Sequence, residues 1–386
     1  MKQGPQLGLR APGVSVRPGR APYVVGHNLI KAHAEAWHLY NETFRAKQGG
    51  LISITINSDW AEPRNPHNQE DVEAARRYLQ FLLGWFAHPI FKNGDYNEVM
   101  KKRIRERSLA QGLKKSRLPE FTESEKQRIK GTYDYFGLNH YTTVLAYNLN
   151  YPAGVMSYDS DRGVASVSDR SWLNSGSAWL KVTPFGFRKL LRWIKEEYND
   201  PPIYVTENGI SERGAFNFND TWRTHYHRSY INEALKAVVL DGVDLRGYTA
   251  WTLMDNFEWA VGFDERFGFY HVNFTDPNLP RRPKASARFY SQIINCNGFP
   301  DPATGSHPCL EPEPEGTVAP TDTAPAPAES VHFLGLELTS HSAETGLYVQ
   351  FALCVVVVLV LALLAYKYGK LSKRSRKRKH MELHKL

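Results

Sequence analysis

A single carboxylate follows a short apolar run near the middle of the chain. Residues 203–205, Ile-Tyr-Val, follow two prolines and predict a buried strand. Glu207 stands where this strand ends, and Asn208-Gly209 supplies a turn. Parallel α/β sheets and barrels place their chemistry at the carboxyl ends of strands. A lone acidic residue there is more often a helix cap or an ion-pair partner, so Glu207 needs companions before it indicates catalysis.

Two other stretches supply such companions. The run F-G-L-N-H-Y-T at 136–142 predicts the end of a strand. Asn139 and Tyr141 lie there two residues apart, so their side chains face the same way. The run W-T-L-M-D-N-F-E-W-A-V-G-F-D-E-R-F-G at 251–268 carries Glu258 among several aromatic residues. Aromatic rings stack on the C–H faces of sugars, although a large core also uses many aromatics. The aromatic content by itself therefore leaves a sugar-binding cleft and a large core equally open.

In order and spacing, these three motifs resemble those of glycoside hydrolase family 1, the retaining β-glycosidases. With the features of the C-terminus described below, the chain most resembles the lactase-like, Klotho-related branch. The resemblance covers roughly residues 11–296 and only the C-terminal part of the family domain. It implies an α/β fold of the (β/α)8 TIM-barrel type, here the C-terminal half with strands five to eight.

The resemblance also assigns roles to individual side chains. Retaining hydrolysis uses two carboxylates about 5–5.5 Å apart, one as nucleophile and one as general acid and base. Glu207 matches the nucleophile, and Tyr141 matches the tyrosine that orients it. The residues that match the family's sugar contacts, or lie on the same strand or loop, are Asn139, Trp251, Glu258, Trp259 and Phe267.

The second carboxylate has no match in this sequence. The family places it in an Asn-Glu-Pro motif at the end of the fourth strand, and this chain has no such motif. Asn41-Glu42 precedes Thr43 and lies in a helical pattern, and Glu62 precedes Pro63 but belongs to the next strand. The family's first-strand glutamine and third-strand His-Trp are missing too. Because a general acid contributes about 10²–10⁴-fold in rate, we expect catalysis to be impaired.

The patterns between the motifs alternate between strand and helix, which indicates parallel βα units. Strands are predicted at 51–57, 135–138, 203–205 and 245–252, and helices at 28–48, 68–88, 97–109, 122–130, 183–198, 220–240 and 283–294. The stretch 144–180 is rich in Gly, Ser, Asp and Tyr and predicts an irregular excursion with hairpins.

The composition predicts five segments. An irregular N-terminus at 1–22 precedes the partial barrel at 23–299, and a Pro/Thr/Ala/Glu-rich stalk follows at 300–345. Residues 346–366 are apolar enough to predict a transmembrane helix, and 367–386 form a basic tail. We therefore expect a single-pass protein of the endoplasmic reticulum or another secretory-pathway membrane, with its tail cytoplasmic and the lipid bilayer as a partner. No signal peptide is predicted at the start, so the side of the membrane for residues 1–346 stays open.

The net charge of +8 comes from the C-terminal tail. Residues 367–386 hold nine Lys or Arg and one Glu, whereas 1–310 hold 39 basic and 32 acidic side chains. This distribution gives no reason to expect a nucleic acid as partner. No metal-ligand spacing is present and no cofactor is expected. Cys296 and Cys309 could form a disulfide or stay free.

Three functions fit these residues. The first is a β-glycosidase acting on β-linked glycosides, which would need a second carboxylate. The second is a Klotho-like module that binds a glycan or a protein partner without turnover. The third is a truncated form that does not fold alone, because four βα units leave two strand edges unpaired.

Overall fold

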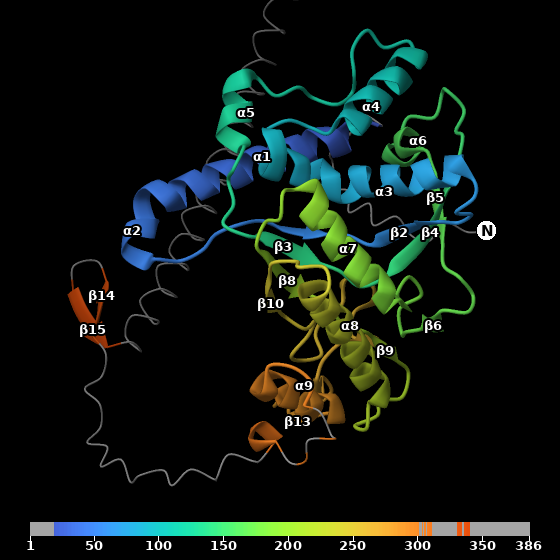
Figure 1. The fold of residues 1–386 in the computed structure, drawn as a ribbon. Coiled ribbons are helices and arrows are strands. Elements are labelled where there is room, and N and C mark those ends of the chain that lie inside the picture. Colours follow the sequence, from blue (N-terminus) through green and yellow to red (C-terminus); the bar gives the residue numbers. More distant parts are fainter. Residues whose placement is uncertain are drawn as a thin grey trace, which may run out of the picture. The chain divides into compact units, whose positions relative to one another are not determined.

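The computed structural model describes residues 19–300, 303, 305, 307–310, 330–333 and 336–339. The chain divides into two units, Met1–Glu311 and Pro312–Leu386. The first unit is built around a parallel sheet, which lies in the middle of Figure 1. Its four strands, in spatial order, are β1 (Thr55–Asn57), β3 (Phe136–Asn139), β8 (Ile203–Glu207) and β10 (Leu245–Tyr248).

Helices follow the strands because parallel neighbours need a crossover connection. Helix α3 (Gln69–His88) connects β1 to β3, α7 (Pro184–Glu197) connects β3 to β8, and α8 (Thr221–Val239) connects β8 to β10. Helix α1 (Ala21–Leu39) precedes β1, and α9 (Ala285–Cys296) follows β10. Helices α7 and α8 lie side by side (Figure 1). Among the described residues β1 and β10 are the edges of the sheet.

Apolar stripes of these helices bury against the sheet. Phe187, Leu190, Leu191 and Ile194 on α7 are fully buried at spacings of three and four residues. They share one core with the apolar strand residues, for example Phe136. One face of α7 therefore packs on the sheet that carries the predicted site.

Helix starts follow from local capping chemistry. The Asn68 side chain accepts a hydrogen bond from the backbone N–H of Glu70 (3.0 Å) at the start of α3. Thr122 and Glu125 form a reciprocal capping box at α5 (Glu123–Ile129). Pro184 occupies the first position of α7. These starts lie within one residue of the predicted ones.

The first helix begins earlier than its sequence pattern predicts. Helix α1 starts at Ala21, seven residues before the predicted position, because Pro22 fits a first turn where no N–H bond is needed. It then continues through a π-helical turn at Tyr40–Phe44 into α2 (Arg45–Gln48), which ends at Gly49 in a left-handed conformation.

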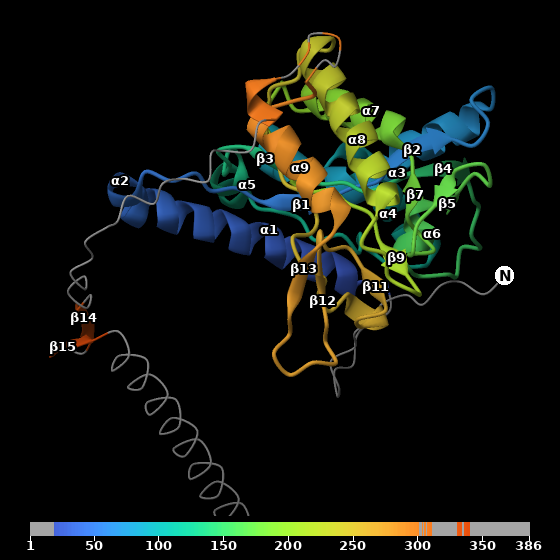
Figure 2. The ribbon, with the colours of Figure 1, turned by 90° about the horizontal axis from the view of Figure 1, so that it is seen from below.

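A second sheet lies beside the first. Strand β2 (Trp60–Pro63) pairs in parallel with β4 (Thr143–Asn148), which pairs antiparallel with β5 (Val164–Val167). The predicted irregular excursion thus contains a hairpin as well as loops. The remaining elements of the unit are α4 (Glu98–Ala110), α6 (Tyr158–Arg162), β6 (Leu173–Asn174), β7 (Lys181–Val182), β9 (Glu212–Arg213), β11 (Glu265–Arg266), β12 (Tyr270–Val272), β13 (Arg281–Pro283), the 3-10 turns Trp259–Val261 and Pro308–Leu310, and the π turn Pro89–Asn93. The β12–β13 hairpin extends away from α8 in Figure 2.

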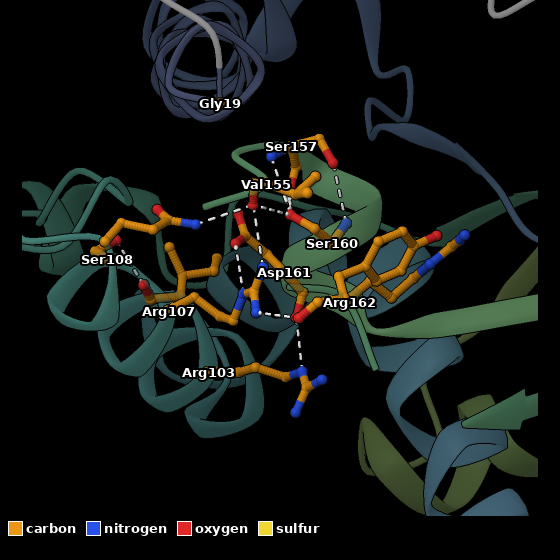
Figure 3. A network of polar contacts seen from close by, with 12 residues as sticks. Gly19, Arg103, Arg107, Ser108, Val155, Ser157, Ser160, Asp161 and Arg162 are labelled. Carbon is orange, nitrogen blue, oxygen red and sulfur yellow. Dashed lines mark hydrogen bonds and ion pairs between the residues drawn. The ribbon is translucent and has the colours of Figure 1, made fainter. Parts of the chain in front are cut away.

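A buried carboxylate ties the excursion to the start of α1. Asp161 is fully buried; it accepts a hydrogen bond from the Tyr23 hydroxyl (2.6 Å) and forms an ion pair with Arg117. Arg117 also donates to the carbonyl of Gly19 (2.7 Å). The backbone carbonyl of Asp161 accepts from Arg103 Nε (2.6 Å), so both ends of this residue are held (Figure 3). Side chains here replace the hydrogen bonds that regular structure would supply.

The two cysteines near the end of the unit form a disulfide. Cys296 at the end of α9 bonds Cys309 in the turn Pro308–Leu310, with their Cα atoms 5.1 Å apart. The sequence left this pairing open.

The predicted membrane location needs correction. In the parts of the chain that the structure describes, no helix has both the length and the apolar character to cross a bilayer. The predicted span at 346–366 and the basic tail at 367–386 lie outside the described residues. We therefore withdraw the single-pass location and the bilayer as a partner.

Within the predicted stalk, β14 (Ser330–Phe333) and β15 (Leu336–Thr339) pair antiparallel. Both segments alternate apolar with polar residues, which suits a strand.

We expect Asp161→Asn to destabilise the protein by about 3–5 kcal/mol, because it leaves the buried Arg117 without a countercharge. Urea unfolding of the full chain measures this change. Glu120→Gln is the control, since it removes one carboxylate from an exposed position and should change stability by less than about 0.5 kcal/mol. Equal midpoints for the two variants would contradict the assigned role of Asp161.

Candidate active site

Glu207 ends strand β8, and the sheet register places it beside Asn139 at the end of β3. The backbone N–H of His140 donates to the Glu207 carbonyl (3.0 Å), which extends the pairing one residue beyond the strand. The Asn139 side-chain oxygen accepts a hydrogen bond from the Thr206 hydroxyl (2.7 Å). Two predicted site residues are therefore brought together by backbone pairing at the carboxyl edge of the sheet.

Tyr141 donates its phenol proton to Glu207 Oε2 at 2.7 Å. The ring is 8% exposed, and burial, followed by the negative charge of Glu207, raises the pKa of Tyr141 well above its usual value. The phenol therefore stays protonated at neutral pH and acts only as a donor toward this carboxylate. This bond fixes the orientation of the Glu207 side chain and engages one of its two oxygens.

The loop after β10 brings a second carboxylate toward the first. The Trp251 side chain hydrogen-bonds the Glu258 carboxylate. Partial burial raises the pKa of Glu258, and the negative charges of Glu265 and Glu207 raise it further. Glu258 thus lies in the electrostatic field of the predicted nucleophile. A carboxyl whose pKa is raised by burial and by neighbouring negative charges is a candidate member of a functional site.

Aromatic rings border Tyr141. Phe267, which is buried, meets it edge to face with ring centroids 6.1 Å apart. Trp259 follows Glu258 in the 3-10 turn, and its side chain is 72% exposed. The structure therefore gathers Glu207, Tyr141, Asn139, Glu258, Trp251 and Phe267, and leaves Trp259 accessible to solvent beside them.

Gly209 is required by a close backbone approach. A Cβ atom there would lie 1.8 Å from the carbonyl oxygen of Trp251, a distance no side chain can accommodate. The Trp251 N–H in turn donates to the carbonyl of Asn208 (2.8 Å). Gly209 thus lets the loop after β10 pack directly on the turn after β8. The Trp251-Thr252 peptide at this contact is cis.

Buried charged side chains also bind the loop 251–268 that follows β10. Asp255 accepts hydrogen bonds from the Gly268 N–H (2.9 Å) and from the fully buried Lys284 ammonium (3.1 Å). Arg223 on α8, also fully buried, donates to the carbonyl of Arg266 (3.0 Å) and forms an ion pair with Asp220. The loop from 251 to 268 has almost no regular structure, so these ionic contacts define its path.

The sequence did not identify two parts of the site. The Trp179 ring meets Tyr141 edge to face at 5.7 Å and is half-exposed. Ser177, two residues earlier, hydrogen-bonds the buried Glu265 carboxylate. Both lie in the excursion that was predicted to be irregular. The only sequence signal was an isolated tryptophan in a run rich in Ser and Gly.

The two alternative carboxylates are engaged elsewhere. Glu62 accepts a hydrogen bond from Trp60 Nε1 (2.8 Å) and pairs with Lys189 on α7. Glu42 is exposed in the π turn, 3.6 Å from a His38 nitrogen. Neither contact involves Glu207. In the described residues no group of three or more His, Cys, Asp or Glu side chains is placed to hold a metal ion.

Comparisons with known proteins agree with the motifs. The model of glycosyl hydrolase family 1 matches residues 2–299. Human lactase/phlorizin hydrolase is 68% identical over 375 residues, which are 97% of this chain and 19% of that protein. Human Klotho is 43% identical over 289 residues, 75% of this chain and 27% of Klotho. Among solved structures, the rice β-glucosidase Os3BGlu6 aligns with a TM-score of 0.66 and 37% identity, covering 72% of this chain and 58% of the enzyme. The chain thus spans only part of each relative.

The raised pKa of Glu258 predicts a pH-dependent cost of folding. The pKa of the Glu258 carboxyl is higher in the folded than in the unfolded protein. Its ionisation therefore destabilises the folded protein, and this loss of stability develops as the pH rises from the unfolded pKa through the folded pKa. Glu258→Gln keeps an acceptor for Trp251 but cannot ionise. We therefore expect the variant to melt at a higher temperature than wild type at pH 7 and at the same temperature near pH 4. Thermal unfolding at both pH values measures this; a variant that melts lower at pH 7 would contradict it.

Proposed function

Because the chain belongs to glycosyl hydrolase family 1, we propose that its site is a retaining β-glycosidase centre with Glu207 as the nucleophile. The observation that carries this proposal is the 2.7 Å hydrogen bond from the Tyr141 phenol to Glu207 at the carboxyl edge of a parallel sheet. We also propose that β1, β3, β8 and β10 correspond to strands five to eight of the family barrel, because the three motifs occur on or after the last three of them in the family's order.

In the first chemical step Glu207 acts as the nucleophile. The free Glu207 oxygen attacks the anomeric carbon of a β-linked sugar, the bond to the aglycone oxygen breaks, and a glycosyl ester forms. Tyr141 keeps the carboxylate turned toward the sugar. Glu258 and Asn139 bind sugar hydroxyls, while Trp251, Trp259 and Phe267 supply ring faces for the C–H groups of the sugar.

A second carboxylate is needed to hydrolyse glycosides whose leaving group must be protonated. It protonates the departing oxygen and then removes a proton from the attacking water. The sequence has no Asn-Glu-Pro motif, and the two other candidates, Glu42 and Glu62, have partners away from Glu207. We therefore propose that this chain is catalytically impaired and acts only on glycosides whose leaving group departs without a proton.

Binding without turnover is the second candidate function. What favours it is that the predicted sugar contacts are present while the acid and base group is missing. In this function the same surface would bind a glycan, or a protein partner as a Klotho-like module. Hydrolysis of an activated glycoside separates the two functions, because only the first forms a bond to Glu207.

We expect the full chain to release 2,4-dinitrophenolate from a 2,4-dinitrophenyl β-glucoside or β-galactoside, whose phenolate needs no proton to leave. Glu207→Gln should reduce this rate by roughly 10³-fold or more, because an amide cannot form the glycosyl ester. Absorbance of the released phenolate measures the rate. Hydrolysis that survives in Glu207→Gln would contradict the assignment of the nucleophile.

Added azide tests whether this chain lacks the general base that activates water. Attack by this anion on the glycosyl ester needs no proton removal, so azide should accelerate turnover of the aryl glycoside on the order of 10–100-fold and yield a β-glycosyl azide. Chromatography with mass spectrometry identifies that product. A complete enzyme would respond little to azide, and a binding module would show no turnover with or without it.

A further inference from the structure

The backbone carbonyl of Tyr141 is held by two buried hydroxyls. Tyr226 and Tyr230, one turn apart on α8, each donate to this oxygen at 2.9 Å. Their rings stack with centroids 4.0 Å apart, and both side chains are fully buried. A carbonyl accepts with two lone pairs, so this pair of tyrosines satisfies it completely.

The direction of every hydrogen bond in this group follows from the chemistry of its members. A carbonyl oxygen can only accept, so the Tyr226 hydroxyl donates its single proton to the carbonyl of Tyr141. The same hydroxyl must therefore accept from Asn208 Nδ2 (3.0 Å). The Asn208 amide also donates to the carbonyl of His140 (2.7 Å). Its oxygen accepts from the Tyr248 hydroxyl (2.6 Å). The orientation of the Asn208 amide is therefore fixed.

This chain of bonds crosses three adjacent strand ends. Tyr248 ends β10, Asn208 follows Glu207 after β8, and Tyr141 follows Asn139 after β3. Tyr226 lies on the helix that connects β8 to β10 and closes the link between Asn208 and Tyr141. The position of Tyr141 relative to Glu207 thus depends on both backbone pairing and a buried side-chain relay.

We propose that Tyr226 is a positioning residue for the nucleophile, acting through the backbone of Tyr141. Its hydroxyl bonds Tyr141 and Asn208, not the Glu207 carboxylate. Removing its hydroxyl leaves the Asn208 amide without one acceptor and the Tyr141 carbonyl with one donor instead of two. The segment 140–142 can then shift, and the 2.7 Å bond from the Tyr141 phenol to Glu207 lengthens. The inference rests on the proposed function for its kinetic readout only.

The test compares Tyr226→Phe with Tyr198→Phe in the full chain. Tyr198 is equally buried, but its hydroxyl has no hydrogen-bond partner in the described residues, so its variant controls for the loss of a buried hydroxyl. The readout is the rate at which 2,4-dinitrophenyl 2-deoxy-2-fluoro-β-glucoside and the matching galactoside label Glu207, followed by mass spectrometry from pH 4 to 9. Tyr248→Phe, which breaks the relay at Asn208 Oδ1, is the second variant if Tyr226→Phe does not fold.

We expect Tyr226→Phe to slow labelling about tenfold, the loss expected from one hydrogen bond, and to shift the acidic limb of the pH profile upward. The shift follows because a carboxylate that loses a donor is easier to protonate. Tyr198→Phe should overlay wild type. A merely structural role would lower the amount of labelled protein without moving the pH midpoint, and that outcome would overturn the proposal.

A crystal structure of Tyr226→Phe separates the two proposals. If wild type is never labelled, the proposed glycosidase function fails, but the positioning role still predicts a distance from Tyr141 Oη to Glu207 Oε2 beyond about 3.5 Å in the variant. An unchanged 2.7 Å distance in a folded Tyr226→Phe protein would overturn the positioning role whatever the activity.

Discussion

Parallel pairing of β3 with β8 is the constraint on which the site depends. The register brings Asn139 opposite Glu207, and a main-chain bond from His140 to Glu207 (3.0 Å) continues this pairing beyond the strands. On the other side of β3, a bond from Ser58 to Asn139 (2.9 Å) continues the pairing with β1. Neighbouring strands lie about 4.8 Å apart, so side chains near their carboxyl ends are within reach of one another. The contact between Tyr141 and Glu207 is a consequence of this spacing.

The loops around the site are held by side chains instead of regular structure. Lys284 and Arg223, both fully buried, bond the segment 251–268, and Asp161 with its arginines bonds the excursion before α7. Buried charges cost desolvation energy, which their partners offset only in a well-defined geometry. Such contacts therefore favour one conformation of each loop over others.

Much of the fold could be predicted because its signals are local. The β-branched strand before Glu207, the capping residues Asn68 and Thr122 and the proline at 184 each act through their nearest neighbours in the chain. The alternation of strand and helix along the chain follows from the same kind of pattern. Trp179 and the Ser177–Glu265 bond escaped prediction because they depend on contacts between segments more than 35 residues apart in the chain.

The sequence by itself determined the family, the candidate nucleophile and the absence of an Asn-Glu-Pro motif, because these reside in residue identity and order. Tertiary structure alone decided that Cys296 bonds Cys309, that Glu258 lies in the field of Glu207, and that Tyr226 reaches the Tyr141 carbonyl. Residue types state what a side chain can donate, accept or attack. Which partner it meets depends on the packing of α8 and the loop after β10 on one sheet edge, which no local pattern encodes.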